Sequence, residues 1–280
     1  MVNAMTRVLV FDSGVGGLSV LDAIAASGHA LSLDYAADNA WLPYGLKSDA
    51  DLRARVPALL RSLTEQWAPQ AIVVACNTAS TIALDAVRAA VSIPVVGVVP
   101  PIKPAAALTK TGVIGLLATP ATVRRAYTDD LIAQFAAGKR VVRFGSAALV
   151  EAAERKLRGE ADDGAAVREA ITGLFGAPGG AEIDVVALAC THFPLLAQEL
   201  AAAAPHPVQW LDSGAAIARR LAQVTGAATG QARLRRAGFT DADAARALFP
   251  AFAVRGFSTF ARIGASAPFE AEPVIGEASA

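Results

Sequence analysis

The sequence lacks any run of about 18 consecutive apolar residues, the length that a helix needs to cross a membrane. It also lacks a surplus of either charge, because 25 Lys and Arg residues balance 25 Asp and Glu residues. A chain without a basic surplus has no general attraction for nucleic acid. The first residues lead directly into the apolar segment 8–11, without the pattern of a secretory signal peptide. We therefore expect a soluble, cytoplasmic protein that has neither a membrane nor nucleic acid as a partner.

Cysteine is scarce as well, since Cys76 and Cys190 are the only two in 280 residues. This excludes a disulfide-rich framework, and both thiols are expected to be reduced in the cytoplasm. Apolar residues make up 54% of the chain and charged residues 18%, which predicts a sizeable core and excludes global disorder. The length suits one large α/β domain or two smaller ones.

Each cysteine follows a short apolar segment that has the length of a buried strand. Cys76 follows residues 72–75, and Cys190 follows residues 185–189. The polar residues after each thiol, Asn-Thr in one case and Thr-His in the other, are able to begin a helix. The two thiols thus occupy equivalent positions in the predicted secondary structure.

Strands and helices alternate along the whole chain. The predicted strands cover residues 7–11, 31–36, 72–75, 93–99, 112–117, 139–144, 185–189 and 208–211. The predicted helices cover residues 18–26, 48–67, 81–90, 147–158, 167–175, 195–203 and 215–224, with a further one after residue 122. Such alternation predicts doubly wound parallel sheets.

The order of segments in the first part of the chain recurs in the second part. The prolines within residues 100–104 interrupt regular structure and mark a crossing between the two parts. We expect two pseudo-symmetric α/β domains, one formed by residues 1–98 with 208–280 and the other by residues 99–207. Ligands of such sheets bind beyond the carboxyl ends of the strands. If the domains face each other, both thiols lie in the cleft between them.

A glycine-rich turn, Asp-Ser-Gly-Val-Gly-Gly at residues 12–17, separates the first strand from the first helix. Backbone N–H groups in such a turn can bind an anion. The spacing does not match the dinucleotide-binding pattern. The alternative is a tight turn in which Ser13 caps the helix.

Several interpretations of the two cysteines remain open at this point. They could be buried small apolar residues, although their polar neighbours suit a core poorly. A zinc site needs more ligands at short spacing, and a redox pair usually has the Cys-x-x-Cys pattern. A Cys-His hydrolase leaves one cysteine without a role. A pair of acid/base groups on opposite sides of one carbon atom uses both thiols.

Four segments carry a family resemblance, and they occur in a fixed order. They are Asp12–Gly17, Asp38 with Pro43-Tyr44-Gly45, Ala75–Thr78 and Ala189–Pro194. Together they resemble the glutamate racemases of the cofactor-independent aspartate/glutamate racemase family, over residues 7 to about 220. The resemblance implies an isomerase that interconverts L- and D-glutamate without a cofactor or metal and supplies D-glutamate for peptidoglycan. It also implies a homodimer, because the family is often dimeric.

The resemblance assigns roles to individual residues. Cys76 and Cys190 would be the two acid/bases, the first acting on D-glutamate and the second on L-glutamate. Asp12 would assist Cys76, and His192 would assist Cys190. Substrate binding would involve Asp12, Ser13, Tyr44, Gly45, Asn77, Thr78, Thr191 and His192. Supporting positions would be Asp38, Thr119, Thr122 and Glu154.

The match departs from the family pattern after residue 144. Ser146-Ala147 stand where the family usually has Cys-Pro, and two glutamates follow. Glu154 has the better spacing for the family's acid beside the site, Glu151 is an alternative, and a solvated helix face explains either one equally well. We have no functional interpretation of residues 159–180. An aspartate racemase of the same superfamily and a small-anion binding module without turnover remain as alternative functions.

Overall fold

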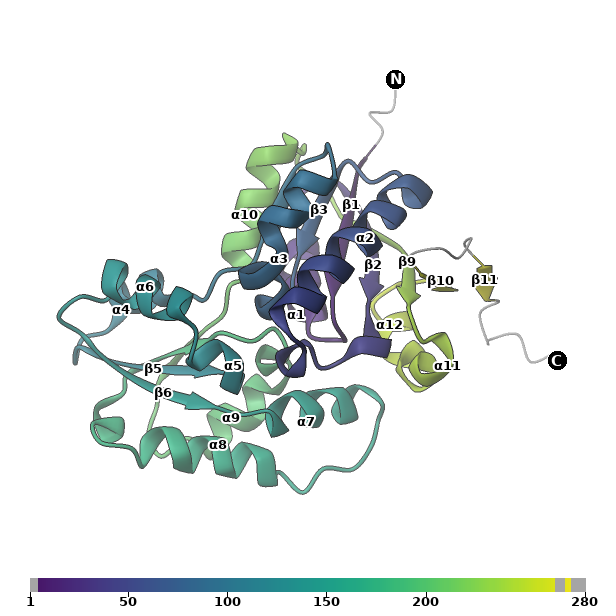
Figure 1. Ribbon diagram of the computed structural model, residues 1–280. Helices are drawn as coiled ribbons and strands as arrows, with labels where there is room; N and C mark the ends of the chain where they lie inside the picture. The colour runs from purple at the N-terminus through teal and green to yellow at the C-terminus, as the bar shows by residue number, and fades with distance from the viewer. Residues whose placement is uncertain (1–4, 265–269, 273–280) are drawn as a thin grey trace.

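The computed structural model describes residues 5–264 and 270–272. Residues 1–4, 265–269 and 273–280, which we assigned to the first domain, lie outside the described part. Within that part the chain forms two sheets, each between layers of helices (Figure 1). None of the described helices combines the length and apolar character that a membrane span requires.

The first sheet contains seven strands in the described part of the chain. Their spatial order is β11 (Glu270–Glu272), β10 (Thr259–Arg262), β9 (Arg233–Phe239), β2 (Leu31–Ala37), β1 (Thr6–Asp12), β3 (Ala71–Val74) and β4 (Val95–Gly97). All neighbours pair in parallel except β10 and β11, which are antiparallel. Helices cover both faces of this sheet: α1 (Gly17–Ala25), α2 (Asp49–Trp67), α3 (Asn77–Ala90), α10 (Gly214–Thr225), α11 (Ala242–Ala245) and α12 (Phe249–Ala253).

The second sheet is entirely parallel and has four strands among the described residues. Their order is β6 (Arg140–Gly145), β5 (Val113–Ala118), β7 (Val185–Leu188) and β8 (Gln209–Leu211). Its helices are α4 (Ile102–Leu108), α5 (Pro120–Val123), α6 (Ala126–Phe135), α7 (Ala148–Leu157), α8 (Ala165–Phe175) and α9 (Ala197–Ala203). Short 3-10 helices are η1 (Asn39–Trp41), η2 (Tyr44–Leu46), η3 (Gly180–Glu182), η4 (Phe193–Leu196) and η5 (Arg246–Leu248).

The two sheets repeat one arrangement, which confirms the predicted pair of doubly wound α/β units. The order β2-β1-β3-β4 in the first sheet corresponds to β6-β5-β7-β8 in the second. Apolar side chains form a separate cluster on each face of each sheet. The strands are apolar along their length because both faces are covered, as is typical of parallel sheets.

Three expectations about single elements were wrong. β8 lies in the second sheet, where it pairs with β7, so the boundary that we placed at residues 207/208 falls one strand too early. The chain returns to the first unit only with α10, which packs against α1. The proline-rich segment does not stop regular structure, because α4 begins at Ile102 and prolines in a first helical turn forfeit no intrahelical hydrogen bond. β9, β10 and β11 have no counterpart among the predicted strands.

Residues 159–180 have a structural role that the sequence left unexplained. Half of them form α8, whose buried residues include Val167, Ile171 and Leu174. These side chains belong to the apolar cluster that covers one face of the second sheet. Burial of this face gives the helical half of the segment its structural role.

Candidate active site

Each cysteine lies two residues beyond the end of its strand, and the two strands are equivalent. Cys76 follows β3 and occupies the capping position of α3, while Cys190 follows β7. β3 and β7 hold the same place in the two sheets, next to the first strand of each. Both cysteines are only 6% exposed, and neither forms a disulfide. The topology therefore presents two buried thiols from matching positions.

Both thiols line a single cavity between the two halves. Its lining residues are Ser13, Leu42, Pro43, Tyr44, Gly45, Cys76, Asn77, Thr78, Thr119, Val150, Cys190, Thr191 and His192. A wider hollow of about 260 Å³ adjoins the cavity, and five residues line both: Leu42, Pro43, Gly45, Thr119 and Val150. The exposed Leu46 lines the hollow but not the cavity, so the hollow lies on the solvent side.

On the first side of the cavity, Cys76 contacts a serine that is bound to a carboxylate. Its Sγ lies 3.7 Å from Ser13 Oγ, and this hydroxyl donates a 3.3 Å hydrogen bond to Asp12 Oδ1. Burial raises the pKa of the Cys76 thiol to about 12, and the charge of Asp12 adds to this rise. Hydrogen bonds from Ala79 and Ser13 act in the opposite direction. Cys76 is consequently a protonated thiol near neutral pH.

On the second side, Cys190 contacts a histidine rather than a hydroxyl. Cys190 Sγ lies 3.8 Å from His192 Nδ1, and His192 Nε2 lies 2.9 Å from Glu154 Oε1. Burial by itself lowers the pKa of His192, but the hydrogen bonds and charges of Cys190 and Glu154 together raise it well above its usual value. A protonated imidazole therefore stands beside this sulfur, which makes the two sides electrostatically different.

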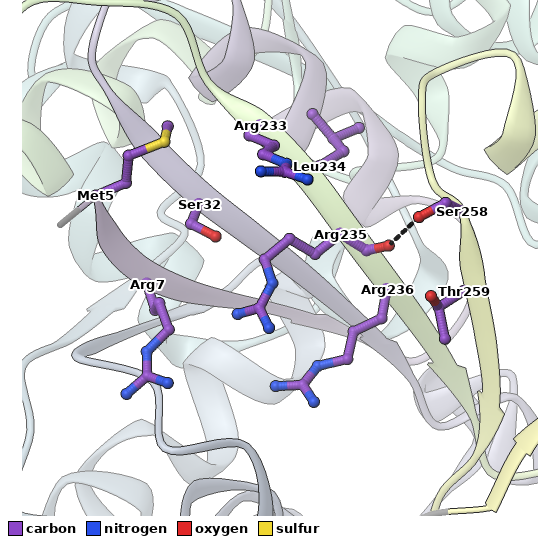
Figure 2. A pocket seen from close by; sticks show the side chains of 9 residues that line it. All are labelled: Met5, Arg7, Ser32, Arg233, Leu234, Arg235, Arg236, Ser258 and Thr259. Carbon is purple, nitrogen blue, oxygen red and sulfur yellow. Dashed lines mark hydrogen bonds between the residues drawn. The ribbon is translucent and has the colours of Figure 1, made fainter. Parts of the chain in front are cut away.

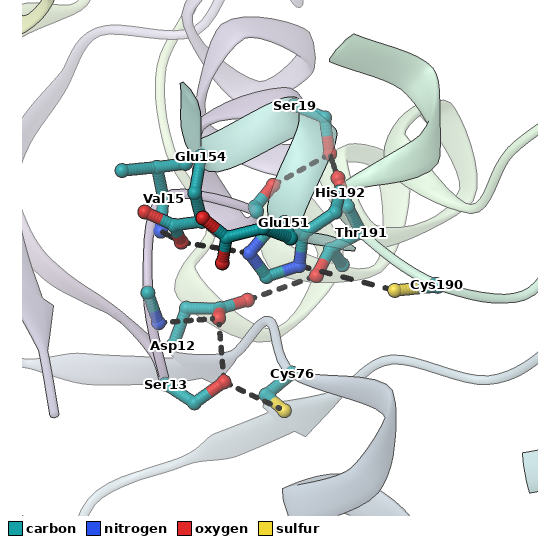
Figure 3. Close-up of polar contacts among 12 residues, drawn as sticks. Asp12, Ser13, Val15, Ser19, Cys76, Glu151, Glu154, Cys190, Thr191 and His192 are labelled. Carbon is teal, nitrogen blue, oxygen red and sulfur yellow. Dashed lines mark hydrogen bonds and ion pairs between the residues drawn. The ribbon is translucent and has the colours of Figure 1, made fainter. Parts of the chain in front are cut away.

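Polar contacts join the two sides across the interface between the halves (Figure 3). Thr191 Oγ1 donates a 2.9 Å hydrogen bond to Asp12 Oδ2, and the Val15 N–H donates a 2.8 Å hydrogen bond to Glu154 Oε1. Ser19 Oγ donates to the Thr191 carbonyl at 2.8 Å. Burial raises the pKa of Asp12, although His192 and the bonds from Gly14 and Thr191 oppose the rise.

The glycine-rich turn serves close packing between the halves. A Cβ atom on Gly14 would collide with the carboxylate of Glu154. One on Gly16 would lie 2.5 Å from His192 Nδ1 and 2.6 Å from Thr191 Oγ1. The N–H groups of Gly14 and Val15 already donate to protein carboxylates. Ser13 does not cap α1, because Gly16 occupies that position.

Asp38 anchors the loop that carries Tyr44 and does not line the cavity. Its buried carboxylate accepts hydrogen bonds from Tyr44 Oη at 2.6 Å, from Thr240 Oγ1 at 2.9 Å and from two nitrogens of Arg55. Burial raises the pKa of Tyr44, so its hydroxyl remains a donor. Tyr44 and Gly45 are thereby held in the cavity wall.

Of the other predicted residues, some line the cavity and one lies behind its wall. Asn77, Thr78 and Thr119 line the cavity, and Asn77 Oδ1 is buried without a hydrogen-bond partner among the described residues. Thr122 is fully buried behind the wall, with its Oγ1 atom 3.0 Å from Thr119 Oγ1. Thr119 also caps α5 by accepting from the Thr122 N–H.

The structure separates the two candidate glutamates. Glu154 is 2% exposed and binds both His192 and Val15, as described above. Glu151 is exposed, and its carboxylate pairs with Arg158 at 3.1 Å. Both glutamates belong to α7 and lie less than one turn apart, so the boundary between the buried and the exposed surface of the helix runs between them. Ser146, which departs from the family pattern, accepts a hydrogen bond from the Leu149 N–H near the start of α7.

Sequence reasoning missed several residues that position the site. Arg55 and Thr240 fix Asp38, and the buried Tyr35 donates a 2.6 Å hydrogen bond to the Gly14 carbonyl. None of these residues stands in a local pattern that signals a site. Among the described residues, no group of three or more His, Cys, Asp or Glu side chains is arranged to hold a metal ion.

Comparison with known proteins places this geometry in context. The family model for Asp/Glu/hydantoin racemases matches residues 13–221. A glutamate racemase of Sphingopyxis alaskensis is 52% identical over 255 residues, which cover 91% of this chain and 88% of the relative.

Solved structures agree with the sequence comparison. A glutamate racemase of Escherichia coli, in complex with L-glutamate and the activator UDP-MurNAc-ala, is 43% identical with a TM-score of 0.84, covering 93% of this chain and 98% of its own. A glutamate racemase of Thermus thermophilus, in complex with beta-chloro-D-alanine, is 31% identical with a TM-score of 0.74, covering 92% and 97%.

Proposed function

Because the chain belongs to the Asp/Glu/hydantoin racemase family, we propose that it is a glutamate racemase in which Cys76 and Cys190 carry the proton. The observation that carries this proposal is the pair of buried thiols that line one cavity from equivalent strand ends. Racemisation removes a proton from one face of Cα and returns a proton to the other. That exchange needs a base and an acid on opposite sides of the substrate.

The different surroundings of the thiols suit the direction from L- to D-glutamate. Cys190 acts as a thiolate, and protonated His192 stabilises its negative charge before the transfer. The thiolate then takes the proton from Cα. Cys76, protonated because of its raised pKa, donates its proton to the opposite face of the carbon. The Cα–H bond breaks on one side and a new one forms on the other. Cys190 ends as a thiol and Cys76 as a thiolate.

The reverse direction uses the same groups with their roles exchanged. Cys76 must first lose its proton, and Asp12 accepts it through the hydroxyl of Ser13. Burial raises the pKa of Asp12 toward that of a useful general base. Cys76 then removes the proton from D-glutamate, and Cys190 donates to the other face. Asp12 and His192 are thus the partners of the first and the second thiol.

The cavity wall offers groups that fit an amino acid. The buried Asn77 Oδ1 is an acceptor for the substrate ammonium group. The first turn of α3 presents backbone N–H groups and a positive dipole end, which favour a carboxylate. The hydroxyls of Ser13, Thr78, Thr119 and Thr191 complete the polar lining. In this buried site, fixed dipoles stabilise the charge that develops on the substrate.

We extend the proposal to the cellular role by analogy with the Escherichia coli relative. That protein is described with L-glutamate and a UDP-MurNAc-ala activator, which links it to cell-wall precursors. The present chain would supply D-glutamate for peptidoglycan in the cytoplasm, acting as a homodimer. Multi-angle light scattering of the purified protein tests the dimer, since a monomeric mass contradicts it.

Circular dichroism of the amino acid tests the proposed activity. Purified protein without added cofactor should bring the optical signals of L-glutamate and of D-glutamate to zero. Decay with aspartate alone would keep the two-thiol mechanism and change the substrate to aspartate. No decay with either amino acid would contradict the proposal and favour a small-anion binding module.

A further inference from the structure

A second cavity, of about 600 Å³, lies where strands of the first sheet begin. Its lining residues are Met5, Arg7, Ser32, Arg233, Leu234, Arg235, Arg236, Ser258 and Thr259 (Figure 2). Thr6, Leu31, Arg233 and Thr259 are the first residues of β1, β2, β9 and β10. The candidate active site lies beyond the opposite, carboxyl ends of the strands. The two cavities share no lining residue.

The charge of this cavity is strongly one-sided. Four of the nine lining residues are arginines, and none of the nine is acidic. One carboxylate lies beneath them, that of the fully buried Asp34. Arg236 binds it through two 3.1 Å contacts, and Arg235 Nη1 lies 3.8 Å from it. Within residues 5–264 and 270–272, the guanidinium groups of Arg7 and Arg233 take part in no ion pair.

A β-bulge concentrates the arginines at this place. Leu33 of β2 pairs with Leu234 of β9, but Tyr35 pairs with Ala237, so two residues of β9 stand opposite Asp34 alone. Those two residues are Arg235 and Arg236. A bulge redirects side chains that regular alternation would send to opposite faces. Figure 2 shows both guanidinium groups extended to the same side, toward the space that Arg7 also enters.

Structural needs explain Arg236, and in part Arg235, whose Nη1 lies 3.8 Å from Asp34. Arg236 neutralises Asp34, donates to the Trp67 carbonyl and stacks on the Trp67 ring. Arg7 and Arg233 bring further positive charge to the same hollow, and no ion pair within the described part of the chain offsets it. Four positive charges around one described carboxylate repel one another. An anionic ligand would remove this repulsion.

We propose that this cavity binds a small molecule that carries a pyrophosphate or a longer phosphate chain. Planar guanidinium groups bind phosphate oxygens through paired hydrogen bonds, and several of them suit a ligand with several negative charges. The hydroxyls of Ser32 and Thr259 add neutral donors to the wall, whereas that of Ser258 donates to the Arg235 carbonyl. The volume falls in the range of roughly 300 to 1,000 Å³ that is typical of small-molecule sites.

Calorimetric titration of the full chain with pyrophosphate at low salt tests the proposal. We expect one site per chain, with a Kd at or below about 1 mM that weakens as salt is added. The double variant Arg233→Gln/Arg235→Gln should weaken binding by about tenfold or more, because it removes charged hydrogen bonds. Arg236 stays in place, since its loss would leave the buried Asp34 without its main counter-charge.

The matched control is Arg219→Gln/Arg220→Gln, which removes the same charge from exposed positions on α10. This control should bind pyrophosphate like the unmodified protein. The absence of saturable binding, or an equal loss in both double variants, would overturn the proposal. Titration with ATP and with tripolyphosphate identifies the source of the phosphate chain: tighter binding of ATP assigns a nucleotide, and equal binding assigns the phosphate chain alone. Racemisation by the Arg233/Arg235 variant should be unchanged, which shows that the fold is intact.

Discussion

The hydroxyl of Thr191 donates a 2.9 Å hydrogen bond to the carboxylate of Asp12, although 179 residues separate them in sequence. Thr191 follows Cys190 directly, and Asp12 reaches Cys76 through Ser13. The bond therefore connects the surroundings of one thiol with those of the other. Together with the bonds from Val15 to Glu154 and from Ser19 to Thr191, it holds the two halves to each other at the cavity.

Replacing Thr191 by Val should weaken both stability and catalysis. The substitution keeps the shape of the side chain but leaves a buried oxygen of Asp12 without its donor, a loss of about 1–3 kcal/mol. We expect kcat/KM to fall equally for both enantiomers, since L- and D-glutamate have the same free energy. Denaturant unfolding and circular dichroism measure the two effects. Thr191→Ser, which retains the donor, should behave like the unmodified protein; equal losses in both variants would show that the methyl group matters instead.

Asp12→Asn should increase stability at neutral pH although it lowers racemisation. The folded state raises the pKa of Asp12 above 3.8, so the stability linked to its protonation is present below that value and is lost as the pH rises through the raised pKa. At neutral pH the ionised carboxylate consequently opposes folding, and Asn removes this cost. We expect the unfolding free energy of the variant, relative to the unmodified protein, to increase from acid to neutral pH.

The same variant should lower racemisation by roughly 100- to 10,000-fold, the usual contribution of a general base. Polarimetric assays beside the unfolding curves give both quantities from one preparation. An activity close to normal would exclude Asp12 as the partner of Cys76. A stability difference that shrinks as the pH rises would contradict the raised pKa.

Cys76→Ser and Cys190→Ser should each abolish racemisation without unfolding the protein. Each variant lacks one of two proton carriers, whereas the other thiol still faces its own side of Cα. In deuterated water, Cys76→Ser should therefore exchange the α-proton of L-glutamate only, and Cys190→Ser that of D-glutamate only. Proton NMR of the α-position follows the exchange. A single variant that racemises at a near-normal rate is incompatible with the two-thiol mechanism.

Glu154→Gln should change the pH dependence of catalysis. Glu154 helps to raise the pKa of His192, so its removal should lower that pKa and move the alkaline limb of the kcat/KM profile to lower pH. Stability linked to a raised histidine pKa is present below 6.5 and is lost as the pH rises through the folded value. The variant should lose part of this stabilisation, which pH-dependent melting detects.

The matched control for that experiment is Glu151→Gln on the same helix. Glu151 is exposed and pairs with Arg158 at the surface, where an ion pair contributes little. Its profile should coincide with that of the unmodified protein. If Glu151→Gln shifts the alkaline limb and Glu154→Gln does not, the assignment of the acid beside His192 is wrong.

The sequence by itself determined the fold class and the two thiol positions. Alternating apolar segments and helices are local patterns, and in parallel sheets the polar residue after a strand must lie at the carboxyl edge. Cys76 and Cys190 could thus be placed at strand ends, and the second sheet was expected to repeat the first. The resemblance of four short segments then supplied the chemistry.

Only the tertiary structure decided which side chains meet. Glu151 and Glu154 differ by less than one helical turn, and packing of α7 buries the second while the first stays in solvent. Asp38 holds Tyr44 in place because Arg55 and Thr240, which are distant from it in sequence, donate hydrogen bonds to its carboxylate. The sheet that β8 joins and the bulge in β9 depend on strand pairing, which is a contact between remote segments. Such contacts leave no local pattern, because the free energy that fixes them comes from burial and hydrogen bonding in the assembled fold.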